Sequence, residues 1–488
     1  MIDIARHPRG HLRHLRSRYL ASCALAMLAV GCAPLVAPAR PATVAIPAQW
    51  SVPAASAPAT PLARWWGRFN DPLLVTLVDD ALAHNHSIEG ARAALAQARA
   101  LADVQAAARL PQLSGSASAQ RQRANANMAS SFAAGFDASW ELDVFGGQRA
   151  AVRAADFNAA ASAASLADIA VSVAAEVALD YLDLRSLQQR LRIARAALDS
   201  QQETLQLTRW RTQAGLSSVQ EVEQARSAVE QTRAQLPTLD SAVAQAASSL
   251  AVLTGRAPGA LREQLAAAGA AYGAIDPGAI VAPAVPAITL RQRPDVKAAE
   301  ARVAAAAALL TQADAARLPD FSLGGSLGLS ALGVAAQPNA ASVVASLLAR
   351  VSAPLLDGGA GQARVRAQQA ALAQAGASYA STVLAALKDV EDGLVALANE
   401  SVRLASLRSG ADAAGRAAAL AGLRYRSGLI DLQVVLDTQR VSLSAQDAVA
   451  ISTSAWHADH VRLYKALGGG WQAPSPSAPQ GTPGEPIQ

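Results

Sequence analysis

The sequence predicts an α+β membrane protein built from a tandem duplication, with four β-strands and two very long helical hairpins in each subunit. Three observations support this fold class. Similar stretches recur at a spacing of roughly 210 residues, period-two patterns of about ten residues follow two of these stretches, and two segments of about 67 residues lack proline. The chain has 488 residues, of which 52% are hydrophobic and 16% charged, so it can bury a large core.

Three pairs of similar stretches indicate the duplication. They are RTQAGLSSVQEVEQAR (211–226) with RYRSGLIDLQVVLDTQR (424–440), AARLP (107–111) with AARLP (315–319), and DVFGG (143–147) with PLLDGG (354–359). Their offsets are 213, 208 and 212 residues, a small drift that is expected when loops vary in length. Two copies are too few for a solenoid. We therefore expect a first repeat at 63–260, a connector at 261–290 and a second repeat at 291–471.

The first 31 residues predict a secretory signal. A stretch with five arginines precedes the apolar run YLASCALAMLAVG, which is too short to span a bilayer with margin. The net charge of the whole chain is +5. Without this segment the chain has 37 basic and 36 acidic residues, a net charge of +1. The high isoelectric point therefore reflects targeting and does not indicate a nucleic-acid partner.

Cys32 ends the motif LAVGC, which resembles a bacterial lipoprotein signal. Gly31 fits that signal well, whereas Ala29 stands where leucine is usual. An ordinary cysteine of the apolar run, or a disulfide with Cys23, are the alternatives. Since Cys23 lies in the segment to be removed, Cys32 would have no partner. We expect a covalent diacylglycerol and an N-linked fatty acid on Cys32, no other cofactor, and a Pro- and Ala-rich extended tether over 32–62.

Period-two patterns predict β-hairpins at about 112–143 and 320–354. No run after Cys32 has the length and bulk of a transmembrane helix, so strands would have to cross the membrane. Soluble hairpins packed on helices are the alternative. Four strands cannot close a barrel, because membrane barrels start at about eight, so other subunits must supply the rest. The expected apolar positions are Phe132, Ala134, Phe136, Ala138, Trp140 and Leu142, then Phe321, Leu323, Leu327 and Leu329, and then Val343, Ala345, Leu347, Ala349 and Val351.

Two segments predict helices of unusual length. Between Gly147 and Gly215 there are 67 residues without glycine or proline, enough for a helix of about 100 Å. The matching segment between Gly361 and Gly428 lacks proline but contains five glycines, so we expect it to be less stiff. Helices this long require coiled-coil packing.

The repeated turns join each long helix to a returning one. Gly215 and Gly428 are placed as left-handed C-terminal caps. Ser218 and Glu221 have the spacing of a capping box, and Asp431 is the equivalent N-cap. The sequence therefore predicts two helical hairpins with the strands at the opposite end.

Six stretches of the mature chain carry a family resemblance. They are WWGRFNDPLL (65–74), WELDVFGGQR (140–149), LAVLTGRAPG (250–259), RPDVKAAEARVAAA (293–306), PLLDGG (354–359) and VRLYKALGGGW (461–471). Through them the chain resembles the TolC/OprM outer-membrane efflux channels, in particular the NodT-like lipoprotein branch that serves resistance-nodulation-division (RND) pumps.

The resemblance implies a homotrimer in the outer membrane. Four strands per subunit would form one 12-stranded barrel, continued by a long periplasmic α-helical barrel. Such a trimer is a passive exit duct for small molecules such as drugs. It is energised by an inner-membrane RND pump through a periplasmic adaptor protein, and it contacts outer-membrane lipid.

The resemblance also implies functional residues near both turns. Adaptor contact is expected at Gly215, Leu216, Ser217, Gly428 and Leu429. A periplasmic gate is expected at Tyr425, Asp437 and Arg440. Val434 and Gln433 depart from the family pattern, where some members have an aspartate and a leucine respectively. From the residues alone, Asp437 and Arg440 are a solvated pair at i, i+3 spacing.

The remaining patterns point away from catalysis and metal binding. The pairs His84 with His86 and His457 with His460 lack a third ligand at a matching position, and lone surface histidines are common. No nucleophile elbow, P-loop or dinucleotide fingerprint occurs, so we expect no enzyme activity. Two alternatives to the pump-linked duct are a periplasmic adaptor lipoprotein and a duct for type I protein secretion. Residues 472–488 are expected to be a disordered tail.

Overall fold

The computed structural model describes residues 44–50, 62–124, 127–267, 290–334, 337–338 and 342–469. These residues form two compact units, and each unit takes segments from both sequence repeats. The strand unit is drawn from 107–154 and 306–372, and the helical unit from the remainder of the described chain. The expected signal peptide, Cys32, most of the connector and the C-terminal tail lie outside the described residues.

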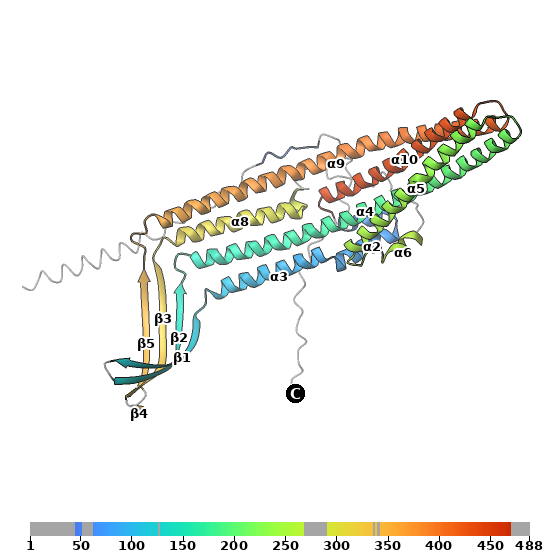
Figure 1. Cartoon of the computed structure of the whole chain (residues 1–488). Helices are drawn as coiled ribbons and strands as arrows, with labels where there is room; N and C mark the ends of the chain where they lie inside the picture. The colour runs from blue at the N-terminus through green and yellow to red at the C-terminus, as the bar shows by residue number, and fades with distance from the viewer. Residues whose placement is uncertain are drawn as a thin grey trace, which may run out of the picture. The chain divides into compact units, whose positions relative to one another are not determined.

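The strand unit contains one antiparallel sheet in the order β1-β2-β3-β5. Figure 1 shows the four strands side by side. β1 and β2 lie where the first hairpin is expected, and β3 and β5 lie where the second is expected. The bounds are Gln112–Ala124 for β1, Asn127–Leu142 for β2, Asp320–Val334 for β3, Gln337–Pro338 for the short β4, and Ser342–Ser352 for β5.

The strand register places every expected apolar position on one face of the sheet. Phe136 is opposite Leu327, which in turn is opposite Ala345, and side chains of such partners point to the same side. We call this surface the apolar face. It comprises Leu113, Gly115, Ala117 and Ala119 of β1, Phe132, Ala134, Phe136, Ala138, Trp140 and Leu142 of β2, Phe321, Leu323, Gly325, Leu327, Leu329 and Ala331 of β3, and Val343, Ala345, Leu347, Ala349 and Val351 of β5.

The opposite face of the sheet is polar. It carries mainly serine, glycine and glutamine, together with Asp137, Glu141 and Arg350, and only a few larger apolar residues such as Val344 and Leu348. No residue that the structure describes covers the apolar face, where side chains such as Phe136 remain 59% exposed. One apolar and one polar surface are the features of a transmembrane barrel wall.

Both outer strands of the sheet have an open edge. Among the described residues, β1 pairs only with β2, and β5 pairs only with β3 and not with another strand. Unpaired backbone groups cannot remain exposed to lipid. The sheet therefore needs further strands from other chains to close.

An aspartate begins each of the two long helices. Asp143 accepts hydrogen bonds from the backbone N–H groups of Gln148 (3.1 Å) and Arg149 (2.9 Å). Asp357 has the same role in the second repeat, although it stands two residues rather than four before the end of the Gly-Gly pair, and it accepts from the N–H groups of Gly359 (2.8 Å) and Gly361 (2.6 Å). The repeated Gly-Gly stretches thus mark strand-to-helix turns that a carboxylate stabilises.

The duplication is visible in the helix lengths, which match in pairs. α4 and α9 each have 67 residues, α5 and α10 each have 35, and α3 and α8 each have 22. Despite its glycines, the second long segment is one continuous helix. The bounds are η1 Leu62–Phe69, α2 Pro72–His84, α3 His86–Ala107, α4 Gly147–Gln213, α5 Val219–Leu253, α6 Arg262–Ala267, α8 Pro294–Ala315, α9 Ala360–Arg426 and α10 Leu432–Ala466.

The core of the helical unit contains the motif WWGRFNDPLL. Trp65 and Trp66 are at most 2% exposed, and the Trp65 ring stacks on Tyr464 with centroids 5.4 Å apart. Asp71 caps α2 and also accepts a short hydrogen bond from the hydroxyl of Tyr181. This motif therefore stabilises the packing of the N-terminal helices against α4 and α10.

Part of the expected tether is packed against the helices. Trp50 is 8% exposed and contacts a buried cluster that includes Val390, Leu394 and Leu463. Residues 44–50 have no helix or strand, as expected, but this segment is not a free linker. The large aromatic side chain of Trp50 packs into an apolar site, which the composition of the segment does not predict.

The expectation that no helix is suited to cross a membrane needs a correction. α4 and α9 each contain an 18-residue stretch that is apolar enough, by length and composition, to cross a membrane, with mean hydropathy of 1.5 and 1.2. Alanine raises the hydropathy of both helices without supplying bulk. Each helix is about 100 Å long, roughly three times the thickness of a bilayer core.

Candidate functional site

Both turns between long helices have the same backbone geometry. Gly215 has φ +75° and Gly428 has φ +71°, values that a residue with a Cβ rarely adopts. The N–H of Leu216 donates to the carbonyl oxygen of Arg211 (2.8 Å), and that of Leu429 to Arg424 (2.9 Å). These bonds form a Schellman motif at the end of each helix, as the sequence predicts.

The two returning helices begin differently. Ser218 and Glu221 form the expected capping box, with both reciprocal hydrogen bonds present (3.3 Å and 3.2 Å). Asp431 occupies the N-cap position of α10, but its side chain makes no capping hydrogen bond. The position of Asp431 was predicted, whereas the capping contact was not found.

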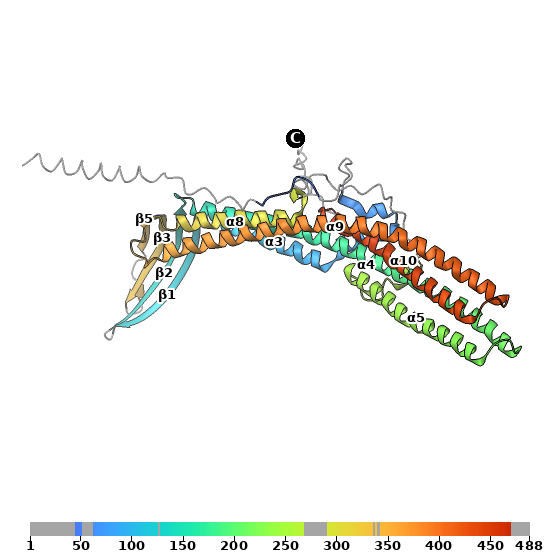
Figure 2. The same cartoon turned by 90° about the horizontal axis from the view of Figure 1, so that it is seen from above.

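The residues expected to contact an adaptor lie at the surface of the two turns. Leu216 is 70% exposed and Leu429 is 72% exposed. Ser217 accepts a hydrogen bond from Thr212 Oγ1 at 3.5 Å. Figure 2 shows the α4–α5 and α9–α10 hairpins with both turns at the same end of the helical unit. The two exposed leucines therefore belong to one end of the molecule.

Tyr425 is held inside its own subunit. It is 3% exposed, and its hydroxyl lies 3.1 Å from Thr208 Oγ1. Arg211 Nη1 donates to the Tyr425 carbonyl oxygen (2.7 Å), and the guanidinium lies 4.6 Å from the centroid of the Tyr425 ring. The last turn of α4 thus fixes the position of this aromatic side chain.

Asp437 and Arg440 form an exposed pair on α10. Arg440 Nη2 donates to a carboxylate oxygen of Asp437 at 3.0 Å. The Arg440 side chain is 76% exposed and the Asp437 side chain is 45% exposed. Gln433 donates to the other carboxylate oxygen at 3.2 Å. Val434 is 45% exposed. Within one subunit, Asp437 and Arg440 are therefore a solvated pair at i, i+3 spacing. Tyr425 lies apart from this pair and is buried.

Two further polar contacts join α4 to α10, and the sequence analysis did not identify them. Arg190 binds Asp447 through two hydrogen bonds of 2.7 Å and 3.2 Å. Gln439 Nε2 donates to Ser200 (3.2 Å) and Thr204 (3.0 Å). With Tyr425 and Arg211, these contacts fasten the second hairpin to the first. Their partners are more than 200 residues apart, so no local pattern marks them.

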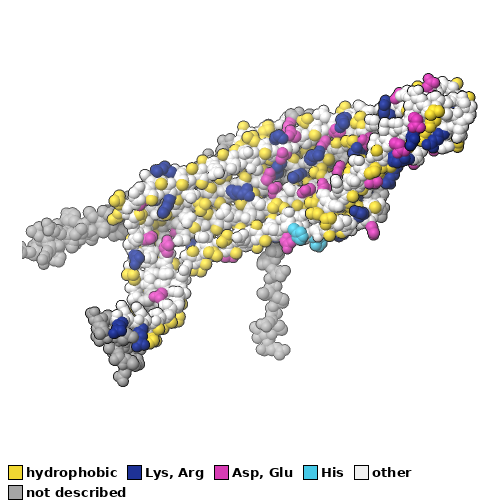
Figure 3. Space-filling view, in the orientation of Figure 1, with side chains coloured by type: hydrophobic (Ala, Val, Ile, Leu, Met, Phe, Trp, Pro, Cys, Tyr) yellow, Lys and Arg dark blue, Asp and Glu magenta, His cyan; other side chains and the backbone are white. Residues whose placement is uncertain are grey.

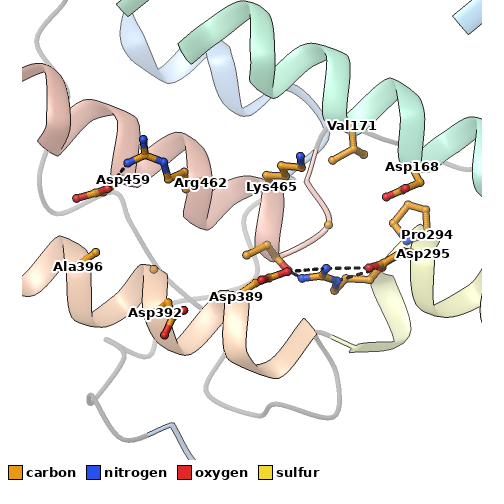
Figure 4. A pocket seen from close by; sticks show the side chains of 14 residues that line it. Asp168, Val171, Pro294, Asp295, Asp389, Asp392, Ala396, Asp459, Arg462 and Lys465 are labelled. Carbon is orange, nitrogen blue, oxygen red and sulfur yellow. Dashed lines mark hydrogen bonds and ion pairs between the residues drawn. The ribbon is translucent and has the colours of Figure 1, made fainter. Parts of the chain in front are cut away.

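A charged pocket of about 430 Å³ brings two of the family motifs together. Arg293 donates to Asp295 (2.8 Å), to Asp389 (3.1 Å) and to the carbonyl oxygen of Ala466 (2.8 Å). Gly468, with φ +75°, leaves room for the Arg293 backbone, which a Cβ would approach to 3.2 Å. Figure 4 shows Arg462 and Lys465 among the acidic side chains of this pocket.

Asp168 of α4 lines the same pocket. Burial, and next the negative charge of Asp295, raise the pKa of Asp168 above its usual value, while Lys465 opposes the shift. These groups are typical of a structural ion network between helices, because most of the charges are already paired.

One of the two histidine pairs differs from expectation in its location, since His84 and His86 are exposed whereas the second pair is buried. His457 is 4% exposed and His460 is 1% exposed, so neither is a surface residue. Burial lowers the pKa of His457 to about 3 and that of His460 to about 4. His460 Nδ1 donates to the carbonyl oxygen of Trp456 (2.7 Å). Among the described residues, no group of three metal-ligating side chains occurs.

Comparison with known proteins establishes the family. The sequence matches the model described as outer membrane efflux protein at residues 77–256 and again at 285–469. The chain belongs to the outer membrane efflux protein family. It is 35% identical to the pyoverdine export outer membrane protein OpmQ of Pseudomonas putida, over 89% of this chain and 94% of that protein. It is 30% identical to nodulation protein T of Rhizobium leguminosarum bv. viciae, over 85% of this chain and 86% of that protein.

A solved structure confirms the fold of this outer membrane efflux protein. The outer-membrane channel OprN superimposes with a TM-score of 0.75 at 32% identity, covering 89% of this chain and 100% of that chain. The protein is therefore a trimeric outer-membrane channel for efflux, with four strands from each subunit in a 12-stranded barrel and a helical barrel beyond it. Closure of the sheet by two further subunits explains the open outer edges of β1 and β5.

Proposed function

We propose that this outer membrane efflux protein is the lipid-anchored exit duct of a tripartite system. An inner-membrane RND pump supplies the energy, a periplasmic adaptor joins pump and duct, and the acyl groups on Cys32 hold the chain in the outer membrane. The duct itself catalyses no reaction and needs no further cofactor. A passive role is supported by the fold, whose charged pocket is filled with paired groups rather than a reactive constellation.

The two equivalent turns carry this proposal. Leu216 and Leu429 occupy matching positions, both exposed by about 70%, at the same end of the helical unit. Exposed apolar side chains in repeated positions suit docking of another protein's helical tips. An adaptor would instead have a single helical hairpin and a lipoyl-like β-domain, which this fold does not resemble. A duct for type I secretion differs in its pump, and the LAVGC motif favours the RND branch.

We further propose that Tyr425, Asp437 and Arg440 close the periplasmic mouth. Three-fold symmetry brings three copies of each side chain around one axis. A ring of Asp437 and Arg440 narrows the opening and concentrates counter-ions there. Tyr425 contributes from the last turn of α9, where Arg211 and Thr208 of α4 hold it in place.

Cysteine crosslinking tests the adaptor contact. Leu216→Cys and Leu429→Cys should each crosslink to a co-expressed adaptor, whereas Val402→Cys should not. Val402 is similarly exposed in the subunit, at 68%, but lies in the interior of α9. Leu216→Asp with Leu429→Asp should abolish pump-dependent efflux while leaving the trimer intact. Normal efflux by that double variant would refute the docking role of the turns.

A further inference from the structure

Two arginines continue the apolar face of β1 toward the hairpin end of the sheet. Arg121 and Arg123 follow Ala119 by two and four residues, so strand alternation places them on the same face. Both are exposed. Figure 3 shows Lys and Arg side chains gathered at this end of the sheet. A charge on this face is unexpected, because the same face is wholly apolar from Leu113 to Ala119.

The height of the apolar face explains where these charges lie. On β2 the face runs from Phe132 to Leu142, a span of ten residue steps. At about 3.3 Å per residue this is about 33 Å along the strand, and a strand tilt of about 40° reduces it to about 25 Å in height. This equals the apolar band of outer-membrane barrels, about 25 Å. Arg121 and Arg123 therefore lie about 5 and 10 Å beyond the hydrocarbon layer.

The orientation of the sheet identifies the leaflet. The long helices α4 and α9 begin at the other end of the strands, after Leu142 and Ser352. In this family fold the helices extend into the periplasm, so the end of β1 at Ala124 faces the outside of the cell. The two arginines thus lie at the level of the headgroups of the outer leaflet.

Both arginine side chains lack a partner among the residues that the structure describes. The backbone of Arg121 and Arg123 pairs with β2, but neither guanidinium makes a hydrogen bond or ion pair with a described residue. A guanidinium presents paired donors that match phosphate oxygens, and basic residues beside an anionic lipid surface bind it. We propose that Arg121 and Arg123 form a lipid-facing site for the phosphate groups of an outer-leaflet lipid, repeated three times around the trimer.

Arg350 provides a matched contrast on the same sheet. It lies on the polar face, in the row of Glu141 and Ser322, and this face lines the barrel interior. Arg350 is also exposed in the subunit. Removing its charge changes the net charge of the trimer as much as removing Arg121, but it leaves the lipid-facing surface unaltered.

Lipid binding to the purified trimer in detergent tests the proposal. Native mass spectrometry would be used to titrate the trimer with bisphosphorylated lipid A. Each arginine should contribute a factor of about five in affinity. We expect Arg121→Gln with Arg123→Gln to weaken binding about 30-fold, each single variant about five-fold, and Arg350→Gln not at all. Lipid A without phosphates should bind the wild-type trimer as weakly as it binds the double variant.

Three results would overturn the proposal. The first is a double variant that binds bisphosphorylated lipid A as tightly as the wild type. The second is a loss of lipid affinity in Arg350→Gln as large as the loss in the single variants Arg121→Gln and Arg123→Gln. That result would show that the net charge of the trimer controls binding. The third is displacement of the lipid by millimolar inorganic phosphate, which would identify a free-anion site. If Arg121→Gln with Arg123→Gln does not assemble, lipid binding is measured on the single variants and on Arg121→Lys with Arg123→Lys. The lysine variant should keep most of the lipid affinity, since lysine retains most of the attraction to phosphate.

Discussion

Asp437 and Arg440 show how a residue's role depends on the number of subunits around it. In one subunit they form an exposed ion pair, which contributes only about 0–1 kcal/mol to stability. In a trimer the same two side chains lie on three symmetry-related helices. A gate made of such residues can open without unfolding any helix, because little free energy holds it closed.

Removing the charges should therefore widen the resting pore. We predict that Asp437→Ala with Arg440→Ala raises single-channel conductance in planar bilayers and leaves thermal stability nearly unchanged. The control is Glu230→Ala with Arg233→Ala, which removes another exposed i, i+3 pair, on α5. Equal conductance in the two double variants would show that Asp437 and Arg440 are ordinary solvated charges on a helix and do not narrow the pore.

Asp168 offers a prediction about pH. Burial and the charge of Asp295 raise its pKa in the folded state, so the ionised carboxylate destabilises the fold at neutral pH. Asp168→Asn should therefore unfold at a higher temperature than the wild type at pH 7. The difference should shrink as the pH falls through the folded pKa and vanish below the usual value of 3.8, where Asp168 is protonated in both states. Calorimetry across this pH range measures the difference in unfolding temperature between the two proteins. An Asp168→Asn variant that unfolds at a lower temperature than the wild type at pH 7 would contradict the prediction.

At the scale of elements, the turns depend on backbone conformation more than on packing. A Cβ added at Gly215 or Gly428 would meet no atom within 4 Å, so space is not the constraint. The positive φ is the constraint, because a left-handed conformation costs roughly 1–2 kcal/mol for a residue with a Cβ. The helix ends, and so the positions of the exposed leucines, are determined by two glycines.

Gly428→Ala should destabilise the second hairpin by about 1–2 kcal/mol. Gly410 provides the control with the opposite sign, because it lies inside α9 with nothing within 4 Å of an added Cβ. Gly410→Ala should stabilise the helix by roughly 0.5–1 kcal/mol. Hydrogen exchange of α9 and α10 amides measures both effects. Equal protection in Gly428→Ala and wild type would show that the turn tolerates a Cβ.

At the scale of the whole molecule, closure and anchoring are separate properties. The open edges of β1 and β5 require three subunits, whereas the acyl groups proposed for Cys32 only attach the finished trimer to lipid. Loss of the anchor should therefore spare the channel. The strands alone keep the protein in the membrane once the barrel has closed.

Cys32→Ser should abolish incorporation of radiolabelled palmitate into the mature protein. Trimers of that variant should still form when a cleavable secretory signal replaces residues 1–31, because the barrel closes through β1, β2, β3 and β5, which lie far from Cys32 in the sequence. Gel electrophoresis of unheated membranes checks assembly, and autoradiography checks the label. Label that persists in Cys32→Ser would disprove lipidation at this residue.

The strands, long helices and turns of this protein can be predicted from local sequence patterns. Alternation of side chains marked the strands and their apolar positions, and the absence of glycine and proline marked α4 and its full length. Gly215 and Gly428 marked the turns, since the end of each long helix needs a residue that adopts a positive φ. Each of these signals is local, because a strand or a helix repeats its pattern every two or 3.6 residues.

Which of these elements contact one another follows from the three-dimensional packing and not from any local pattern. Tyr425 with Arg211, and Arg190 with Asp447, pair across more than 200 residues, and the packing of α4 against the second hairpin brings them together. The burial of His457 and the docking of Trp50 follow from the same packing. A periodic pattern shows that a face is apolar but not which surface will cover it, because that depends on how distant helices fit side by side.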